Sequence, residues 1–383
     1  MKKWIATLLL LLLPCLALAE EDASGITLAD AGVDLPGGSI HYPQVQGLDE
    51  SLTSAVNQAL LDAGNISERL DRATLLTSSA VKLNVSSQAD EQALAGQVLS
   101  VVFTAEGAVT DTRSTWVYST LNMDLSTGEN VTWADLFEDE TSAREDIASY
   151  LEEELAPELS AHLQNSELTP LPEDFTLDAS GMTLYYPIRQ LSTLSDRAGT
   201  VHLSWCELLP YLKLGENTIL RRIGAEAMVT LDDGDIIRET AAGDSLPGIP
   251  AKLGDSMQTL VDTWDQLIDP DLYENGRLIS LDGASFRDVY LMTDRLTETF
   301  TNSVVQGIRM DRGNLYGLCI GKTTQSEWRQ LLGEADNIVT VDEELADSQR
   351  LCVGESDYYQ CGTHTLRLHA DENGVLVSLM LLE

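Results

Sequence analysis

Two short segments carry residues with the types and spacing of catalytic motifs. Gly317–Thr323 (Gly-Leu-Cys-Ile-Gly-Lys-Thr) has the glycines, lysine and threonine of a phosphate-binding loop, but its first glycine lies one residue too close to the Gly-Lys pair. Ser79-Ala80-Val81-Lys82 has the Ser-x-x-Lys spacing in which the lysine deprotonates the serine, a chemistry that requires the pair on a helix. This tetrapeptide begins a strand-like run instead. We therefore expect the first segment to lead into a helix and Ser79 to be an ordinary strand residue.

Residue types that bind metals are spread thinly along the chain. Cys361, His364 and His369 have the side chains of a zinc site, but residues five apart on a strand face opposite sides, so structural roles are expected. Three acidic clusters have the hard oxygens that calcium prefers, without the EF-hand spacing. They are Glu138–Glu140, Asp232–Asp235 and Asp371–Asn373. No His-Glu-x-x-His sequence is present, and nothing marks two carboxylates as a glycosidase pair. We predict no catalytic residue, no metal and no cofactor.

The first residues have the pattern of an export signal. Lys2 and Lys3 precede an apolar run, Trp4–Leu18, and Ala19 closes the small-residue pattern that signal peptidase reads before Glu20. The run is shorter than the roughly 20 residues that cross a bilayer as a helix, so no stable membrane span is expected. We predict a signal peptide over residues 1–19 and a location outside the cell or in the cell envelope. Lipidation at Cys15 is an alternative, although Pro14 stands where a lipid-attachment site has a small residue.

The chain is strongly acidic, with 62 Asp and Glu against 23 Lys and Arg and a formal net charge of −39. Cleavage of the leader removes two lysines and makes the charge more negative still. Phosphate backbones require clustered Lys and Arg, which excludes nucleic acid as a partner, and an anionic membrane surface repels the chain. A basic partner is attracted. A surface of this kind also keeps an exported protein soluble, which needs no partner.

Four cysteines remain after the leader. Cys352 and Cys361 flank Gly354-Glu355-Ser356-Asp357, which reads as a polar turn between two strands, and a hairpin disulfide between them is the preferred pairing. Cys319 competes for either partner, and four cysteines allow three connectivities. Cys206 is expected to pack as a small buried hydrophobe beside Trp205.

Hydrophobic periodicity in the first half predicts strands interrupted by two well-separated helices, an α+β fold class. Apolar residues recur at helical spacing over Glu50–Ala63, and an acidic helix is predicted over Ser142–Leu155. Glu106-Gly107 is expected to end one strand before the next begins. The predicted strands are Ala80–Val85, Gln97–Ala105, Ser114–Leu125, Asp174–Asp178, Thr183–Tyr186 and Gly199–Leu203.

The order of residues in this half resembles the RsiV-like extracellular domain, also found ahead of PdaC-type peptidoglycan deacetylases. The resemblance rests on His41-Tyr42-Pro43, on the Asn-x-Asp-Leu-x-Thr-Gly turn Asn122–Gly128, and on Thr132–Phe137. It implies an α+β domain with an antiparallel sheet over residues 20–213. Members of the family sense lysozyme in membrane-bound anti-sigma factors. Here no cytoplasmic segment precedes the leader and no deacetylase metal motif follows, so neither sigma-factor sequestration nor deacetylation is expected. The loop Ile188–Arg197 lacks the family's aromatic residues.

The second half repeats itself. Residues 214–250 read as a linker or connecting strands, followed by two helix-plus-antiparallel-sheet modules over 251–312 and 313–383. Leu253–Ser256 and Ile320–Thr323 each place a hydroxyl two residues after a glycine, suited to cap a helix. With the Leu-Gly-Glu-x-Asp segment Leu332–Asp336, the modules resemble β-lactamase-inhibitor-like and small outer-membrane-assembly lipoprotein modules. The predicted strands are Arg277–Leu281, Phe286–Met292, Ser303–Ile308, Arg350–Val353, His364–His369 and Val375–Leu381.

These observations favour a secreted, non-enzymatic binding protein of the bacterial cell envelope. Its expected partner is a protein or a cell-wall component, for example a basic protein such as lysozyme. The alternative is an envelope hydrolase or cell-wall-modifying enzyme that uses a carboxylate pair assembled by the fold. Two close carboxylates with shifted pKa values in a deep cleft of the first domain would favour that alternative.

Overall fold

The computed structural model describes residues 25–35, 37–75, 82–110, 113–155, 168–187, 190, 199–249, 251–263, 271–273, 276–280, 289–294 and 303–383. Several predictions from the sequence lie outside these residues. They concern the signal peptide with its Ala19 to Glu20 cleavage site, Cys15, Ser79, and nearly all of the loop 188–197.

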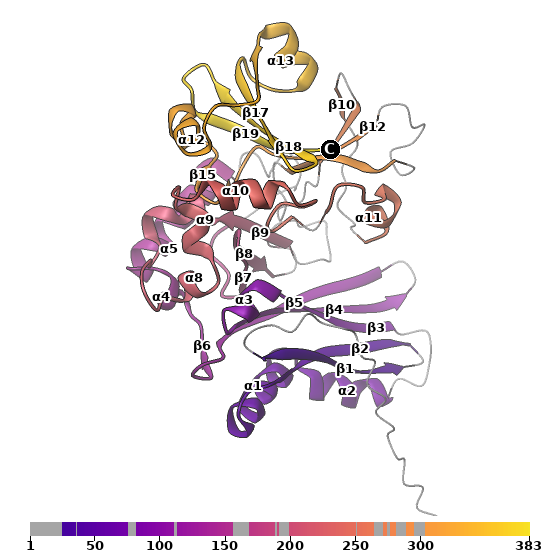
Figure 1. The fold of residues 1–383 in the computed structure, drawn as a ribbon. Coiled ribbons are helices and arrows are strands. Elements are labelled where there is room, and N and C mark those ends of the chain that lie inside the picture. The colour runs from indigo at the N-terminus through magenta and orange to yellow at the C-terminus, as the bar shows by residue number, and fades with distance from the viewer. Residues whose placement is uncertain are drawn as a thin grey trace, which may run out of the picture.

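The first half of the chain is built on a six-stranded sheet whose strands follow one another in chain order (Figure 1). Of the strand pairs described in this sheet, β2 with β3 is parallel and the others are antiparallel, in agreement with the predicted α+β class. The strands are β1 (Thr27–Leu35), β2 (Gly38–Gln46), β3 (Lys82–Ala89), β4 (Val98–Thr110), β5 (Arg113–Asp124) and β6 (Glu129–Asn130).

Two helices, α1 (Glu50–Ala63) and α2 (Ile66–Leu75), cover one face of this sheet (Figure 1). The predicted bounds of α1 are confirmed: Asp49 caps it by accepting from two backbone amides, and Val56 and Leu60, one turn apart, are buried. The predicted break at Glu106-Gly107 is wrong. Both residues lie inside β4, where Glu106 pairs with Trp116 and Gly107 with Thr115, because the long pairing with β5 carries the strand through a half-buried glycine.

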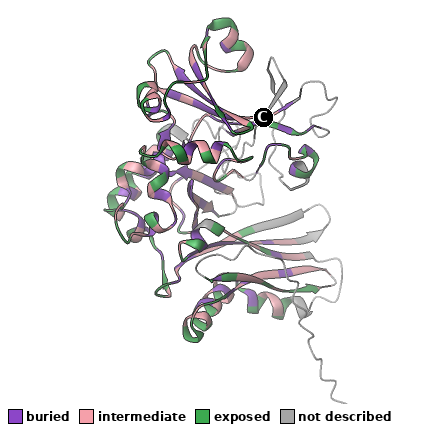
Figure 2. Ribbon diagram, in the orientation of Figure 1, coloured by how far each residue is buried: buried purple, intermediate pink, exposed green. Residues whose placement is uncertain are grey.

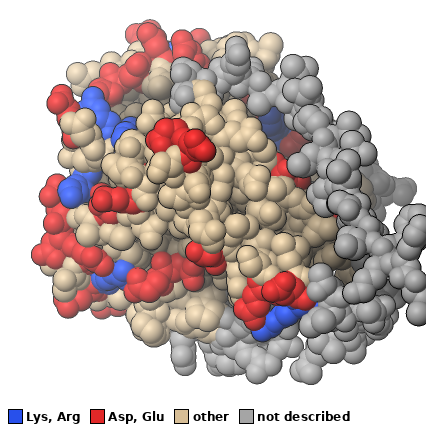
Figure 3. Space-filling model, turned by 90° about the horizontal axis from the view of Figure 1, so that it is seen from below, with Lys and Arg blue, Asp and Glu red and all other residues tan. Residues whose placement is uncertain are grey.

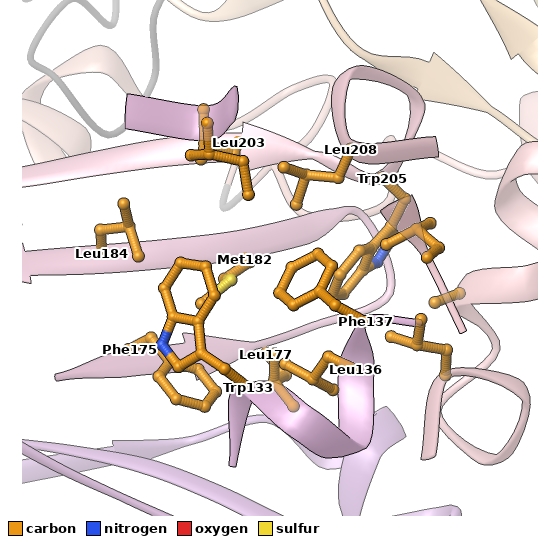
Figure 4. Packing of buried hydrophobic residues seen from close by; sticks show 14 of the residues in the cluster. Trp133, Leu136, Phe137, Phe175, Leu177, Met182, Leu184, Leu203, Trp205 and Leu208 are labelled. Carbon is orange, nitrogen blue, oxygen red and sulfur yellow. The ribbon is translucent and has the colours of Figure 1, made fainter. Parts of the chain in front are cut away.

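The other face of the six-stranded sheet packs against a three-stranded antiparallel sheet, β7 (Phe175–Leu177), β8 (Gly181–Tyr186) and β9 (Gly199–Ser204). Buried polar groups connect the layers: Asn122 Nδ2 donates to the Phe175 carbonyl at 2.7 Å, and the Leu177 amide donates to Ser100 Oγ at 2.7 Å. Figure 4 shows aromatic and aliphatic side chains filling the core beside β7 and β8, with Trp133 near Phe137 and Phe175.

Short helical segments complete this core. They are α3 (Glu91–Ala95), α4 (Trp133–Leu136), α5 (Glu140–Tyr150) with the π-helical turn Leu151–Leu155, and α7 (Trp205–Leu208) with the 3-10 turn Leu209–Tyr211. The acidic helix predicted over Ser142–Leu155 is therefore present, beginning at Glu140 after the N-cap Asp139.

The segment 214–250 forms helices rather than connecting strands. α8 (Ile219–Arg222) and α9 (Ala225–Val229) bury residues in the core of the first half, and α10 (Gly234–Ala241) buries Ile237 and Ala241 in the core of the second. Apolar residues recur in this segment one helical turn apart, and Thr218 and Asp233 form the N-caps of α8 and α10. Both features favour helices over strands. The segment therefore joins the two cores by packing into both.

The second half contains one eight-stranded antiparallel sheet to which each predicted module contributes four strands. The strand order is β10-β11-β12-β13-β19-β18-β17-β16, so the modules meet where β13 pairs with β19. Helices α11 (Met257–Thr263) and α12 (Gln325–Leu332) precede the two sets of strands, as the repeat predicts. The strands are β10 (Asp271–Tyr273), β11 (Gly276–Ser280), β12 (Val289–Asp294), β13 (Val305–Met310), β16 (Asn337–Val341), β17 (Gly354–Cys361), β18 (His364–Asp371) and β19 (Leu376–Leu382).

Some details of the second module differ from the prediction. Arg350–Val353 is not a strand: Arg350 ends helix α13 (Glu343–Gln349) in the left-handed conformation, and β17 begins at Gly354. The N-cap of α12 is Thr324, which forms a capping box with Glu327, whereas the Thr323 hydroxyl donates to the Gly317 carbonyl. A small hairpin, β14 (Asn314–Leu315) and β15 (Leu318–Cys319), precedes α12.

Burial follows these layers: buried residues line the facing sides of the sheets, and exposed residues lie on the outer helices (Figure 2). Within the residues that the structure describes, no helix is long and apolar enough to cross a membrane.

Arg222 connects α8 to the six-stranded sheet. Its side chain donates hydrogen bonds to the carbonyls of Gly96 and Gln97 at 3.0 and 2.8 Å, and to both carboxylate oxygens of Asp124 at 2.7 and 2.9 Å.

We predict that Arg222→Ala lowers the free energy of unfolding by about 2–3 kcal/mol, because these four acceptors lose their hydrogen-bond donor. Urea unfolding measures this change. Arg221→Ala, at the neighbouring exposed residue, is the matched control and should change stability by less than about 0.5 kcal/mol.

The same ion pair gives a pH dependence. Burial raises the pKa of Asp124, but hydrogen bonds from Arg222 and Ser126 outweigh it and lower the pKa from 3.8 to about 2. A carboxyl group with a lowered folded-state pKa stabilises the fold above its unfolded pKa and loses this contribution as the pH falls through the folded value. The difference in stability between the native chain and Arg222→Ala should therefore shrink between pH 3.8 and about 2. A difference that grows with acid would contradict this assignment.

Candidate functional site

A serine, a histidine and an aspartate meet at the turn between β7 and β8. Ser180 Oγ lies 3.4 Å from His202 Nε2 and donates to Asp178 Oδ1 at 2.5 Å, while His202 Nδ1 lies 3.0 Å from the Thr183 hydroxyl. In a catalytic triad the aspartate accepts a hydrogen bond from the histidine, which in turn takes the proton of the serine. Here the aspartate instead accepts its hydrogen bond from the serine. A Cβ at Gly248 would lie 2.2 Å from Ser180 Oγ, so a neighbouring loop covers the hydroxyl, and the group stabilises a turn.

A cysteine and a histidine also meet at the start of β17. Cys352 is exposed, and its Sγ lies 3.6 Å from Nε2 of the buried His369. The same Nε2 lies 2.9 Å from the Cys352 carbonyl oxygen, which can only accept, so Nε2 carries the proton. Burial first, then Asp371 and Asp311, raise the pKa of Cys352, and burial lowers the pKa of His369. This thiol is therefore not activated as a nucleophile.

The predicted disulfide between Cys352 and Cys361 is wrong. The two residues lie at opposite ends of β17, because Gly354–Asp357 is part of this strand and the hairpin turn falls after Cys361. A strand of eight residues spans roughly 27 Å at about 3.4 Å per residue, whereas bridged Cα atoms lie within about 7 Å. The structure joins no two of the four described cysteines in a disulfide.

The suggested metal sites have structural roles. Asp233 and Asp139 cap α10 and α5, and Asp371 accepts from the amides of Asn373 and Val375 in the turn between β18 and β19. The two ring nitrogens of His369 are hydrogen-bonded to the Ser356 hydroxyl and to the Cys352 backbone carbonyl. Among the described residues, no group of three or more His, Cys, Asp or Glu side chains is placed to hold a metal ion.

The segment that imitates a phosphate-binding loop connects the two cores. The Lys322 ammonium donates to the Cys206 carbonyl at 2.5 Å, so it is directed at α7. Gly317 has a φ of +81°, and a Cβ there would lie 2.4 Å from the Leu231 backbone nitrogen. The glycine is required by close packing against the segment after α9, and the predicted start of a helix is confirmed by α12.

Sequence reasoning missed the partly buried ion pair of Arg312 with Glu207 beside this segment. Glu207 caps its own helix by accepting from the Ser204 amide and hydroxyl at 2.9 Å. Its other oxygen accepts from Arg312 at 2.6 Å and from the Tyr150 hydroxyl at 2.5 Å. Burial raises the pKa of Glu207, but Arg312 and Tyr150 outweigh it and hold the pKa below its usual value. The Ser-x-x-Glu capping box Ser204–Glu207 was the available sequence signal.

Two other carboxylates, the buried Asp357 and the half-buried Asp124, are likewise paired with arginine. Asp357, fully buried, accepts from Arg329 at 2.6 and 2.7 Å and from Trp328 Nε1 at 2.9 Å. Hydrogen bonds and neighbouring cations lower the pKa of five carboxyl groups, those of Glu68, Asp124, Glu207, Glu327 and Asp371. A general acid at neutral pH requires a raised one. These carboxylates therefore suit structure and charge rather than proton transfer.

Much of the negative charge lies on the outer surface. On the side of α1 and α2, Asp and Glu residues are spread over the face and Lys and Arg are few (Figure 3). On α13, Glu343 and Glu344 are exposed, and the exposed Asp347 lies 3.9 Å from the C-cap Arg350. The arrangement can attract a cationic ligand over a broad area.

The comparisons with known proteins give partial likenesses in structure. No family model matches the chain, and no curated protein matches it in sequence. A DUF3298 family member from Bacteroides fragilis is 14% identical with a TM-score of 0.36, over 52% of this chain and 95% of its own. A DUF3298 family protein from Pseudomonas aeruginosa is 9% identical with a TM-score of 0.36, over 50% and 96%. A DUF4309 family protein from Bacillus subtilis is 12% identical with a TM-score of 0.26, over 39% and 97%.

We predict that Cys352 reacts as an unactivated thiol. Because its pKa is raised above 9.0, the rate of alkylation by iodoacetamide should still be rising at pH 9.0. Mass spectrometry of the alkylated Cys352 peptide measures this rate, and Cys352→Ser is the control for the buried thiols. A rate that levels off below about pH 7 would show that His369 activates the thiol.

We predict strong coupling between Arg312 and Glu207. Arg312→Met should lower the free energy of unfolding by about 3 kcal/mol, because Glu207 keeps its charge in a buried place. The double variant Arg312→Met with Glu207→Gln should lose at least about 1 kcal/mol less unfolding free energy than the sum of the losses in the two single variants. Urea unfolding of the four chains measures the cycle, and Arg72→Met, at an exposed ion pair with Glu68, is the control. Additive costs would show that the pair contributes nothing.

Proposed function

We propose that the chain is an exported, non-enzymatic binding protein of the bacterial cell envelope that holds a basic protein or a cell-wall component. The observation that carries this proposal is the strongly acidic composition of the chain, with 62 acidic and 23 basic residues and a formal net charge of −39. At this density the field of the whole protein raises the local concentration of a cationic partner.

The placement of the charges supports binding. Arginines neutralise the interior carboxylates Glu207, Asp357 and Asp124, as described above, so the net negative charge is carried by the surface. Carboxylates on the surface, such as Glu68 and Asp371, have lowered pKa values through hydrogen bonds to Asn65 and to the Val375 amide, respectively. They stay ionised in mildly acidic surroundings, so the attraction persists there.

The sequence supplies the remaining support. The leader directs the chain out of the cytosol, and the RsiV-like resemblance connects the first half with extracellular recognition of lysozyme, a basic protein. No step of catalysis is required by this proposal, because rigid sheets that carry fixed surface charge are sufficient for capture.

Capture of a cationic protein at low salt tests the proposal. Immobilised chain should retain lysozyme at about 20 mM salt, and retention should fall at least tenfold by about 300 mM, where screening is strong. Lysozyme with acetylated lysines, which has lost its charges, should be retained at least about fivefold less. Wall fragments are tested in the same way.

A pair of variants separates surface charge from folding. Glu343→Lys with Glu344→Lys should weaken capture at low salt, whereas Glu343→Asp with Glu344→Asp, which keeps the charge, should not. Both residues are exposed in the first turn of α13, where they leave the N-cap Asp342 intact. Absence of retention at low salt would refute the proposal. So would turnover of wall fragments by the purified chain.

A further inference from the structure

Two cysteines from different halves of the fold meet in the interior. Cys206 lies on α7 and is 2% exposed, and Cys319 ends β15 and is 4% exposed. The Cys206 and Cys319 thiols are hydrogen-bonded to each other, so the two side chains are in direct contact. Trp205 and Leu208 of α7 pack in the first core, and Leu315 and Leu318 of the β14–β15 hairpin pack in the second.

Polar contacts on both sides hold the two cysteines together. The Lys322 ammonium donates to the Cys206 carbonyl at 2.5 Å, and Lys322 and Thr323 donate their amides to the Cys319 carbonyl at 3.1 and 2.8 Å. Next to Cys206, Glu207 accepts from Arg312 at 2.6 Å. The contact between the thiols therefore lies within a fixed junction, as a disulfide requires.

The other two cysteines are placed differently. Cys352 and Cys361 are separated by the length of β17, and the Cys361 thiol donates to the Tyr359 carbonyl at 3.6 Å within that strand. Of the pairings that four cysteines allow, the fold brings together Cys206 and Cys319.

We propose that Cys206 and Cys319 form a disulfide bond that covalently fastens α7 of the first half to the β14–β15 hairpin of the second. A bond of this kind persists in the oxidising compartments to which the leader directs the chain. It converts a junction of hydrogen bonds and one ion pair into a permanent connection. It also closes a loop of more than one hundred residues, which removes much of the conformational freedom of the unfolded chain.

The chemistry is thiol–disulfide exchange with an oxidant disulfide, either a protein oxidoreductase or oxidised glutathione. One cysteine sulfur attacks the oxidant and releases one of its thiols, and the second cysteine then attacks this mixed disulfide and releases the other. Two protons and two electrons leave the cysteines, and the oxidant becomes two thiols. Because both sulfurs are buried, exchange takes place while the two halves dock.

Peptide mapping of the whole chain tests the bond directly. The chain is refolded in a mixture of reduced and oxidised glutathione, alkylated under denaturing conditions, digested without reductant and analysed by mass spectrometry. We expect one cross-linked peptide pair that contains Cys206 and Cys319, with Cys352 and Cys361 alkylated. Alkylation of both Cys206 and Cys319, or a cross-link from either of them to another cysteine, would overturn the proposal.

Thermal unfolding gives a second measurement. The oxidised chain should melt about 5–10 °C above the chain kept in reductant, because the bond restricts the unfolded state. Cys352→Ser should keep this difference, and Cys206→Ser and Cys319→Ser should each lose it. A redox-dependent shift that survives in Cys206→Ser would overturn the proposal. If a serine variant does not fold, the peptide map of the native chain decides.

Discussion

The contact of Arg312 with Glu207 joins the two hydrophobic cores, and much of the fold depends on it. Glu207 already caps α7 and accepts from Tyr150 of α5, so one carboxylate fixes two helices of the first half. Arg312 reaches it from the turn that leads into the β14–β15 hairpin of the second half. Tyr316 in that hairpin packs against both cores. The junction is thus polar at its centre and apolar around it, which fixes one relative placement of the halves.

The sequence predicted the elements whose pattern is local. Helix α1 and the repeat of a helix followed by strands follow from periodicity, which acts over a few positions, although three strands were predicted for each module and the sheet contains four. Errors arose where a distant partner decides the conformation. Glu106-Gly107 continues β4 because β5 pairs along its length, and Gly354–Asp357 is a strand because β16 and β18 flank it. The pairing of Glu207 with Arg312 depends on tertiary packing, which spacing along the chain does not encode.

The sites that imitate catalysis show how common catalytic side chains are in ordinary turns and strand ends. Two pairs lie close enough for proton transfer, Ser180 with His202 and Cys352 with His369. In each pair, however, the proton is donated to an acceptor other than the catalytic partner. Asp178 accepts from Ser180, and a backbone carbonyl accepts from His369. The direction of a hydrogen bond therefore distinguishes a catalytic from a structural group of side chains better than the distance between them does.

The meeting of the two modules at β13 and β19 has a consequence for assembly. Each module has four strands, and the seam between them is a short register of four residue pairs, Gly307–Met310 with Leu379–Leu382. Along these residues β13 and β19 pair with each other, so neither strand presents unpaired amides and carbonyls on this side. The seam therefore removes strand edges at which the sheet of another chain could otherwise add.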